Sequence, residues 1–267
     1  MLWGPVMHQA YFFILALSLG MARLFPCLLL TPIFSFTAVK GLLRTAIVIA
    51  LALFPAPLIQ RELAAQPPDF IPLAGLALKE LLIGTLIGLL LSMPFWLYES
   101  VGALFDNQRG ALMGGQLNPQ LGLDVTPLGH LLQQTIILLL VLGPGLSTVT
   151  QVIWDSYELW PVTAWWPFPS EAGFKVYQHL LAELFFNMVL YAGPLVVLLL
   201  LMDFAVGILS LYSPQLQATT LAVPIKCLLG LLFFVVYLPI LGYLANQRLY
   251  DLRDLIHILP TLVGKPG

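Results

Sequence analysis

Long apolar runs alternate with short polar connections along most of the chain. Six runs reach or approach the ~20 apolar residues that a helix needs to cross a bilayer. They lie at residues 10–34, 42–59, 73–98, 128–153, 180–212 and 219–245. Each run contains a proline, namely Pro26, Pro55, Pro94, Pro144, Pro194 and Pro239. Such bends are tolerated where neighbouring helices satisfy the freed carbonyls, so the pattern predicts six kinked helical spans with many packing partners.

Two connections between these runs have a character of their own. Residues 55–72 contain five prolines and are predicted to form a short polar turn. Residues 154–170 hold four of the six tryptophans and are predicted to form an irregular interfacial aromatic belt. An aromatic ligand cage is the alternative for the second connection.

The composition places the chain outside the class of ordinary soluble domains. It has 267 residues, of which 60% are hydrophobic and 9% charged, whereas a soluble domain carries about 25% charged residues. The class is therefore an integral membrane protein or a subunit buried in a hydrophobic assembly, with an all-α fold. The formal net charge of -2 gives no electrostatic case for binding nucleic acid. The N-terminus lacks a basic region, so no cleavable signal peptide is expected.

No constellation of catalytic or metal-binding residues is visible. Four histidines are scattered at no ligand spacing, at His8, His130, His179 and His257. No nucleophile elbow and no phosphate-binding glycine loop occurs. Cys27 and Cys227 lie inside apolar runs and are expected to pack as inert side chains rather than to form a disulfide or a metal pair. We expect neither enzymatic activity nor a cofactor.

A polar, glycine-rich stretch interrupts the apolar pattern between the third and fourth runs. Residues 105–124 read FDNQRGALMGGQLNPQLGLD, with two acids, one base, three glutamines, two asparagines and four glycines. Irregular polar backbone at membrane depth is stable only where protein buries it or where it lines a water-filled cavity. Glycine permits compact turns there. An ordinary external loop is the alternative interpretation.

Charged residues inside the last two runs are expected to pair, because unpaired charges at membrane depth are costly. If a helical hairpin turns near Pro214, Asp203 lies about eleven residues before the turn and Lys226 twelve after it. Glu183 and Arg248 straddle nearly the same midpoint. At a rise of ~1.5 Å per residue the offset is small, which predicts two ion pairs. Alternatively, each charge meets a different subunit or water.

The same residues carry a resemblance to the SctT/FliR family. Residues 202–232 are similar to its C-terminal signature, an acid in a helix, Pro-Gln at the turn and Pro-x-Lys opening the last helix. Here these residues are Asp203, Pro214, Gln215, Pro224 and Lys226. Residues 101–115 resemble the family's Gly-x-x-x-Asp-x-Gln-x-Gly segment, with Gly102, Asp106, Gln108 and Gly110 at its fixed positions. The wording "DNQRG" is closer to the injectisome branch than to the flagellar branch.

The resemblance implies an architecture and a set of partners. The family is the single-copy membrane subunit of the type III secretion and flagellar export gate. Its members join five SctR-like and four SctS-like subunits in a cone-shaped assembly (5:4:1), with an SctU-like switch protein, an SctV-like cytoplasmic nonamer and an ATPase nearby. The expected fold is an SctR-like unit at residues 1–175 followed by an SctS-like helical hairpin at 176–267. The complex lies in the bacterial inner membrane, raised toward the periplasm, and passes unfolded proteins.

The resemblance also implies that residues 105–124 project into the channel and plug it. The implied plug residues are Phe105, Asp106, Asn107, Gln108, Arg109, Gly110, Met113, Gly114, Gly115, Asn118 and Pro119. The residues implied in hairpin and subunit packing are Glu183, Asp203, Pro214, Gln215, Pro224, Lys226 and Arg248. A small-molecule or ion transporter is the alternative function, although internal repeats with paired broken helices, which a transporter should show, are not visible. An intramembrane enzyme lacks a candidate nucleophile or metal set.

Overall fold

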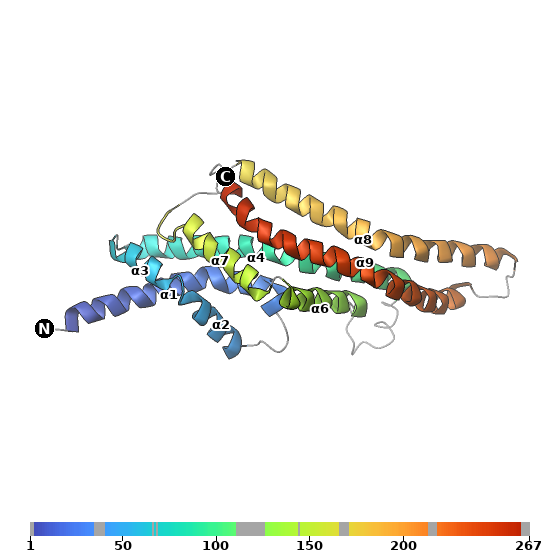
Figure 1. Cartoon of the computed structure of the whole chain (residues 1–267), viewed down its shortest axis with the longest axis horizontal. Helices are drawn as coiled ribbons and strands as arrows, with labels where there is room; N and C mark the ends of the chain where they lie inside the picture. Colours follow the sequence, from blue (N-terminus) through green and yellow to red (C-terminus); the bar gives the residue numbers. More distant parts are fainter. Residues whose placement is uncertain are drawn as a thin grey trace. The chain divides into compact units, whose positions relative to one another are not determined.

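The protein is predominantly helical in the part that the computed structural model describes, which is residues 3–34, 41–65, 67, 69–110, 126–143, 145–165, 171–212 and 218–262. No strand occurs in these ranges, which confirms the all-α prediction. The helices are α1 (Trp3–Leu30), the 3-10 helix η1 (Pro32–Phe34), α2 (Leu42–Ala52), α3 (Ala56–Ala65), α4 (Phe70–Arg109), α6 (Pro127–Leu142), α7 (Leu146–Leu159), α8 (Glu171–Tyr212) and α9 (Ala218–Leu262) (Figure 1). Seven candidate residues lie outside the described ranges: Met113, Gly114, Gly115, Asn118, Pro119, Pro214 and Gln215.

The predicted spans correspond to single long helices or to bent pairs of helices. Within the described residues, four helical segments are long and apolar enough to cross a membrane: Met7–Leu30, Phe70–Arg109, Gly173–Tyr212 and Ala222–Leu252. The number rises to six if α2 with α3, and α6 with α7, each count as one broken span. The first of these breaks falls at Pro55, where the chain bends by 62°. Pro26, Pro94 and Pro194 instead lie inside α1, α4 and α8.

Two compact units divide the chain, and each combines stretches that are distant in sequence. Unit 1 comprises Met1–Met93, Pro144–His179 and Asp251–Gly267, and unit 2 comprises Pro94–Gly143 and Leu180–Tyr250. The expected division into an SctR-like unit and an SctS-like hairpin concerns likeness to other subunits, and it stays a prediction.

Unit 1 is built around close packing of α1 against α2, α3 and the first half of α4. A Cβ atom added at Gly84 would lie 2.0 Å from the carbonyl oxygen of Arg23, and one at Gly88 would lie 2.9 Å from the Cα of Cys27. Glycines four residues apart therefore let the backbones of α1 and α4 touch, as in small-xxx-small helix pairs. Leucine and isoleucine side chains fill the surrounding core, with Leu24, Leu28, Ile59, Leu63, Ile87 and Leu91 fully buried.

Helix α3 replaces the predicted polar turn at residues 55–72. Its buried residues, Ala56, Ile59 and Leu63, follow helical spacing and face the core of unit 1. The prediction of a turn from the prolines was wrong because Pro55 precedes the helix and Pro57 occupies its first turn, where a proline is tolerated.

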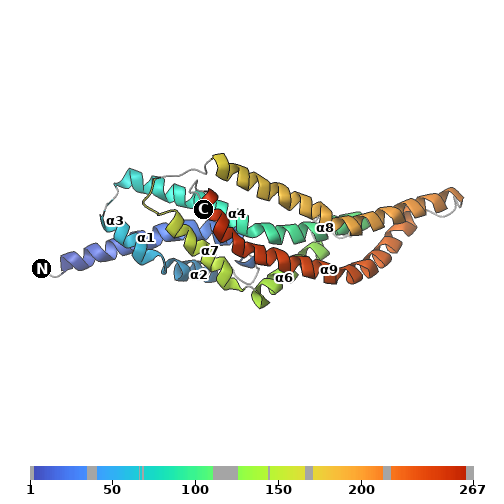
Figure 2. The same cartoon turned by 45° about the horizontal axis from the view of Figure 1, so that its top comes forward.

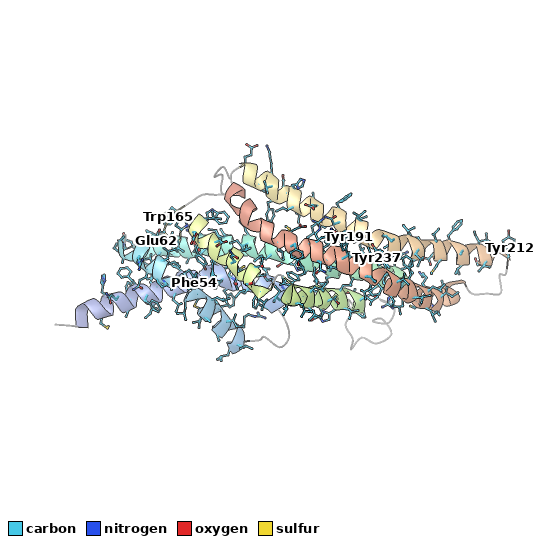
Figure 3. All side chains as sticks on the ribbon, viewed as in Figure 1. Phe54, Glu62, Trp165, Tyr191, Tyr212 and Tyr237 are labelled. Atoms are coloured by element: carbon cyan, nitrogen blue, oxygen red, sulfur yellow. The ribbon has the colours of Figure 1, made fainter. Side chains whose placement is uncertain are left out.

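Unit 2 contains α6, the end of α4, and the parts of α8 and α9 that form an antiparallel hairpin. Residues 180–212 and 218–250 run alongside each other in opposite directions in both views (Figures 1 and 2). Large apolar side chains on these helices remain exposed in the isolated chain (Figure 3), and Tyr212 at the end of α8 is 84% exposed. The surface of this hairpin therefore has the apolar character of a membrane or subunit contact.

Candidate functional site

Both ion pairs that the charge spacing predicts are present in the α8–α9 hairpin. Asp203 Oδ1 lies 2.9 Å from Lys226 Nζ, and Glu183 Oε1 lies 2.7 Å from Arg248 Nη1. The Nε of Arg248 also donates to the hydroxyl of Tyr191, at 3.2 Å. Because all four charges are partly buried, the pairs oppose sliding or rotation of one helix against the other.

Tyrosine hydroxyls add hydrogen bonds to the same packing. Tyr237 of α9 donates to the carbonyl of Tyr191 in α8 at 3.2 Å, and these two residues are labelled in Figure 3. Tyr98 of α4 donates to the carbonyl of Leu241 in α9 at 3.0 Å. Buried hydroxyls that reach backbone carbonyls in this way tie α4, α8 and α9 together within unit 2.

The polar segment begins later than the sequence predicts. Residues Phe105–Arg109 form the end of α4, and Gly110, which follows the last helical residue, has a left-handed φ of 87°. Such a conformation suits glycine at a helix C-terminus. The expectation of irregular backbone from Phe105 was wrong. Phe105 is fully buried and its ring stacks on that of Phe234, with 5.5 Å between the ring centroids. Tertiary packing therefore extends the helix. The plug role of the segment stays a prediction.

Lys226 connects the hairpin to the end of α4. Its Nζ donates to the carbonyl of Gln108 at 3.2 Å while it pairs with Asp203. The Nε2 of Gln108 in turn lies 3.5 Å from Asp203 Oδ2. The last carbonyls of a helix lack helical partners and carry partial negative charge, so a lysine at this position stabilises the helix end. The two sequence motifs, which are about a hundred residues apart, thus meet at one point.

Asp106 connects the end of α4 to the beginning of α6. Its carboxylate is fully buried, and Oδ1 pairs with Arg109 Nη2 at 2.7 Å. The other oxygen accepts the backbone N–H of Leu128, at 2.7 Å. The two helices also touch at Gly102, where an added Cβ would lie 2.5 Å from the nitrogen of Gly129. Described residues on both sides of 111–125 are therefore held together.

A second buried charge cluster, in unit 1, was not identified from the sequence. Arg23 is fully buried and donates two hydrogen bonds to Glu80, from Nε to Oε2 at 2.6 Å and from Nη2 to Oε1 at 3.1 Å. It also donates to the carbonyls of Ser156 at 2.7 Å and Trp160 at 2.8 Å. The ring of Tyr157 stacks against the guanidinium, with 4.1 Å from the carbon to the ring centroid. This bidentate, hydrogen-bonded arrangement satisfies charges that would otherwise be costly to bury.

Lys79 extends this cluster to the connection that follows α7. Its Nζ pairs with Glu80 at 3.0 Å and donates to the carbonyls of Pro161, Val162 and Ala164 at 3.1, 2.7 and 2.8 Å. One ammonium thus holds an irregular stretch of backbone against α4. The sequence signal that could have identified the cluster is the presence of charges inside apolar runs.

The tryptophan-rich connection belongs partly to the core of unit 1. Helix α7 continues to Leu159, and Trp160 is only 6% exposed. The expectation of an interfacial belt was wrong for Trp160, since its carbonyl anchors Arg23 inside the protein. Trp165 is 56% exposed, as an interfacial residue would be.

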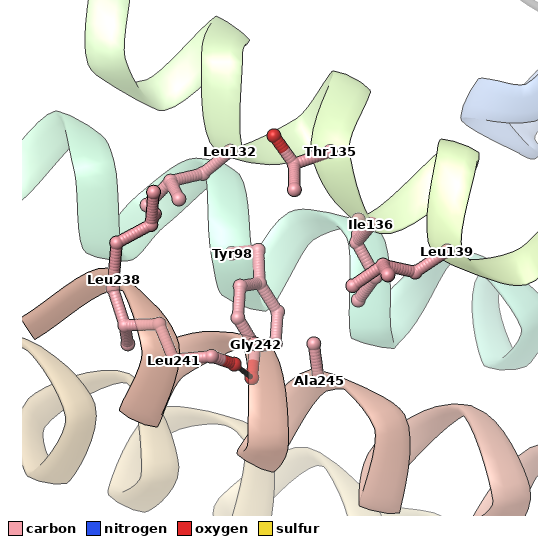
Figure 4. Close-up of a pocket in the computed structure, with 9 residues that line it drawn as sticks. All are labelled: Tyr98, Leu132, Thr135, Ile136, Leu139, Leu238, Leu241, Gly242 and Ala245. Carbon is pink, nitrogen blue, oxygen red and sulfur yellow. Dashed lines mark hydrogen bonds between the residues drawn. The ribbon is translucent and has the colours of Figure 1, made fainter.

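An apolar cavity of about 140 Å³ lies within unit 2 (Figure 4). It is lined by Tyr98, Leu132, Thr135, Ile136, Leu139, Leu238, Leu241, Gly242 and Ala245. The hydroxyl of Tyr98 donates its proton to the carbonyl of Leu241, and the hydroxyl of Thr135 donates its proton to the carbonyl of Leu131. In the described ranges no group of three or more His, Cys, Asp or Glu side chains could hold a metal ion.

Comparison with known proteins gives consistent matches along the chain. A family model described as "Bacterial export proteins, family 1" matches residues 14–252. The "Yop proteins translocation protein T" of Yersinia pestis is 31% identical over 94% of this chain and 97% of its own length. The "Surface presentation of antigens protein SpaR" of Salmonella typhimurium is 30% identical over 82% of this chain and 81% of its own. The "Flagellar biosynthetic protein FliR" of Pectobacterium carotovorum is 24% identical over 84% and 85%.

Proposed function

Because the chain belongs to the bacterial export protein family 1, as its resemblance to the SctT/FliR family predicts, we propose that it is the single-copy structural subunit of a type III secretion export gate. It acts in the bacterial inner membrane as a pore subunit for unfolded protein substrates and not as an enzyme. The injectisome branch is favoured, because the relatives of Yersinia and Salmonella match at higher identity than the flagellar one.

The observation that carries this proposal is the meeting of the two signature motifs at the end of α4. Lys226 of the hairpin holds the carbonyl of Gln108 and pairs with Asp203. Such a network fixes the point where the polar segment leaves the helical framework. A segment anchored firmly at its base and rich in glycine is suited to block a narrow channel and to be displaced from it.

We assign residues 111–125, with the adjoining turn of α4, to the seal of the closed channel. Polar backbone between apolar helices needs either protein or a water-filled lumen around it. Within a pore assembly the lumen supplies that environment. Phe105 and Asp106 contribute as the buried anchor of the seal rather than as part of the plug itself.

The exposed apolar helices support assembly with other export-apparatus subunits. In the isolated chain, α8 carries many exposed large apolar residues, including Phe186 at 67% and Phe204 at 69%. Faces of this kind are normally covered by lipid or by partner subunits. We propose SctR-like and SctS-like neighbours in the 5:4:1 arrangement of the family, raised toward the periplasm, with the SctU-like switch protein and SctV-like nonamer beside them.

The function is tested by deleting residues 111–122 in cells that express the complete apparatus. The complex should still assemble, because the deletion removes none of the packing that unit 2 shows among its described residues. The closed channel should become permeable to ions and small solutes, measured by membrane conductance or solute uptake. An intact complex that stays as tight as the parent would refute the assignment of the seal.

Co-purification separates the proposed role from that of a transporter. An export-gate subunit should be recovered with two other small hydrophobic proteins at unequal copy number. Recovery of the chain alone, or as a homo-oligomer, would instead support a small-molecule or ion transporter.

A further inference from the structure

We propose that Asp106 is a positioning residue that fastens together the two ends of segment 111–125, by capping helix α6 while it holds Arg109 at the end of α4. This inference rests on the proposed sealing role of that segment and names the group that sets its base. It is carried by four features of unit 2.

The first feature is the N-terminus of α6, which lacks a cap of its own. The first N–H groups of a helix have no helical partner and are usually bound by the side chain at the N-cap position. Here Thr126 occupies that position and forms no such hydrogen bond. The N–H of Leu128 donates instead to Asp106 Oδ2 at 2.7 Å, from a residue 22 positions upstream. A carboxylate at this place also complements the helix dipole.

The second feature is the use of the other carboxylate oxygen. Oδ1 of Asp106 receives Arg109 Nε at 2.8 Å and Nη2 at 2.7 Å. The carboxylate is fully buried, so losing either partner would leave a charge in the protein with incomplete compensation. The contact to α6 and the contact to the end of α4 therefore support each other.

The third feature is the order of contacts between α4 and α6. Farthest from the segment, Gln133 donates to Glu99, and next Gly129 touches Gly102 backbone to backbone. Asp106 and Leu128 form the contact nearest to the segment. The glycine contact holds the helices at a fixed separation, and the carboxylate of Asp106 then joins the end of α4 to the beginning of α6.

The fourth feature is the attachment of α4 itself to the hairpin. Lys226 donates to the carbonyl of Gln108, two residues beyond Asp106. The end of α4 that carries Asp106 is thereby also attached to the hairpin, in addition to its contacts with Arg109 and Leu128. The carboxylate can then act as a rigid clasp, meaning a fixed link between α4 and α6.

Three variants separate the contributions of the two partners of this carboxylate, Arg109 and Leu128. Asp106→Ala removes both. Asp106→Asn keeps an amide oxygen for the N–H of Leu128, since asparagine is a good helix cap, but loses the ion pair with Arg109. Arg109→Gln removes the same ion pair from the other side. Glu171→Gln is the matched control, because its carboxylate forms an exposed ion pair with Lys175 in the first turn of α8.

The experiment measures hydrogen exchange at residues 128–130 and solute leakage, both on the complex formed with co-expressed export-apparatus subunits. Asp106→Ala should raise exchange of the Leu128 amide by about tenfold or more, the scale expected for losing a hydrogen bond to a charged group, and should raise leakage. Asp106→Asn should keep most of the protection. Glu171→Gln should match the parent in both measurements.

Two outcomes would overturn the inference. One is unchanged exchange at Leu128 in Asp106→Ala. The other is raised exchange without any leakage in an intact complex. If Asp106→Ala fails to assemble, the double variant Asp106→Asn/Arg109→Gln is compared with its two single variants. Because both single changes remove the same ion pair, the double variant should leak no more than the leakier single variant. Additive leakage would refute the inference. Leakage after deletion of 111–122 tests the sealing role separately, so failure of the clasp would leave that role standing.

Discussion

Replacing Gly84 with alanine should force helices α1 and α4 apart in unit 1. The added Cβ would lie 2.0 Å from the carbonyl oxygen of Arg23, and ordinary contact begins at 3.4 Å. The backbones must therefore separate by about 1.4 Å, because the obstructing atom belongs to the main chain and not to a flexible side chain. The movement also displaces Arg23, whose bonds to Glu80 and Trp160 measure 2.6 and 2.8 Å.

The expected loss of stability follows from three contributions. Overpacking costs about 1–3 kcal/mol. Removing one partner of a buried ion pair costs about 3–5 kcal/mol, which sets the scale for disturbing the Arg23–Glu80 pair. Alanine in place of glycine returns about 1 kcal/mol through helix propensity. The clash and the damaged ion pair overlap in effect, so we expect a net destabilisation of about 3 kcal/mol, which corresponds to about a hundredfold in the population of the opened state.

The thiol of Cys27 provides a local measurement of this opening. Cys27 is fully buried on α1 and faces Gly88, one turn beyond Gly84. In a Cys227→Ser background, the rate of maleimide modification of Cys27 in the purified complex should rise by about a hundredfold in Gly84→Ala, since modification requires local opening.

The matched control is Gly207→Ala in α8, where nothing lies within 4 Å of the added Cβ. Its modification rate should stay at the parental value, because it touches no part of unit 1's α1–α4 contact. Equal rates for Gly84→Ala and the parent would refute the backbone contact between α1 and α4.

Three further predictions concern the charge network and the exposed surface. Asp203→Lys should reduce the yield of assembled complex, because it places two like charges together. Adding Lys226→Asp should restore only part of the yield, since an aspartate cannot donate to the carbonyl of Gln108. No recovery at all would contradict the pairing. Lys79→Met should remove the side-chain donor from the carbonyls of residues 161, 162 and 164 and speed limited proteolysis there. An unchanged cleavage pattern would show that the lysine does not hold this stretch. The chain expressed without its partners should aggregate or be degraded, and a monodisperse monomer on size-exclusion chromatography would argue against the assembly.

The α8–α9 hairpin could be predicted from sequence because depth along antiparallel helices depends only on the distance from the turn. Counting from Pro214 placed Asp203 beside Lys226 and Glu183 beside Arg248, and the structure forms both pairs. The number of apolar runs and their helical character followed from composition and length in the same way, because these properties reside in each segment by itself.

The boundary of the polar segment could not be predicted in this way. Asp106 and Gln108 look like loop residues because they are polar, yet both lie in α4. Their polarity is satisfied by Leu128 and Lys226, which are distant in the sequence. Local composition records that a residue needs polar partners but not where these partners are.

The buried cluster around Arg23 depended on tertiary structure alone. Its partners Glu80 and Ser156 lie 57 and 133 positions away along the chain. The sequence by itself determined the class of protein, the helices, the hairpin and the family resemblance. Which helix faces meet was decided by glycine contacts such as Gly84 against α1 and Gly102 against α6, because steric fit between backbones selects among many apolar faces that periodicity leaves equivalent.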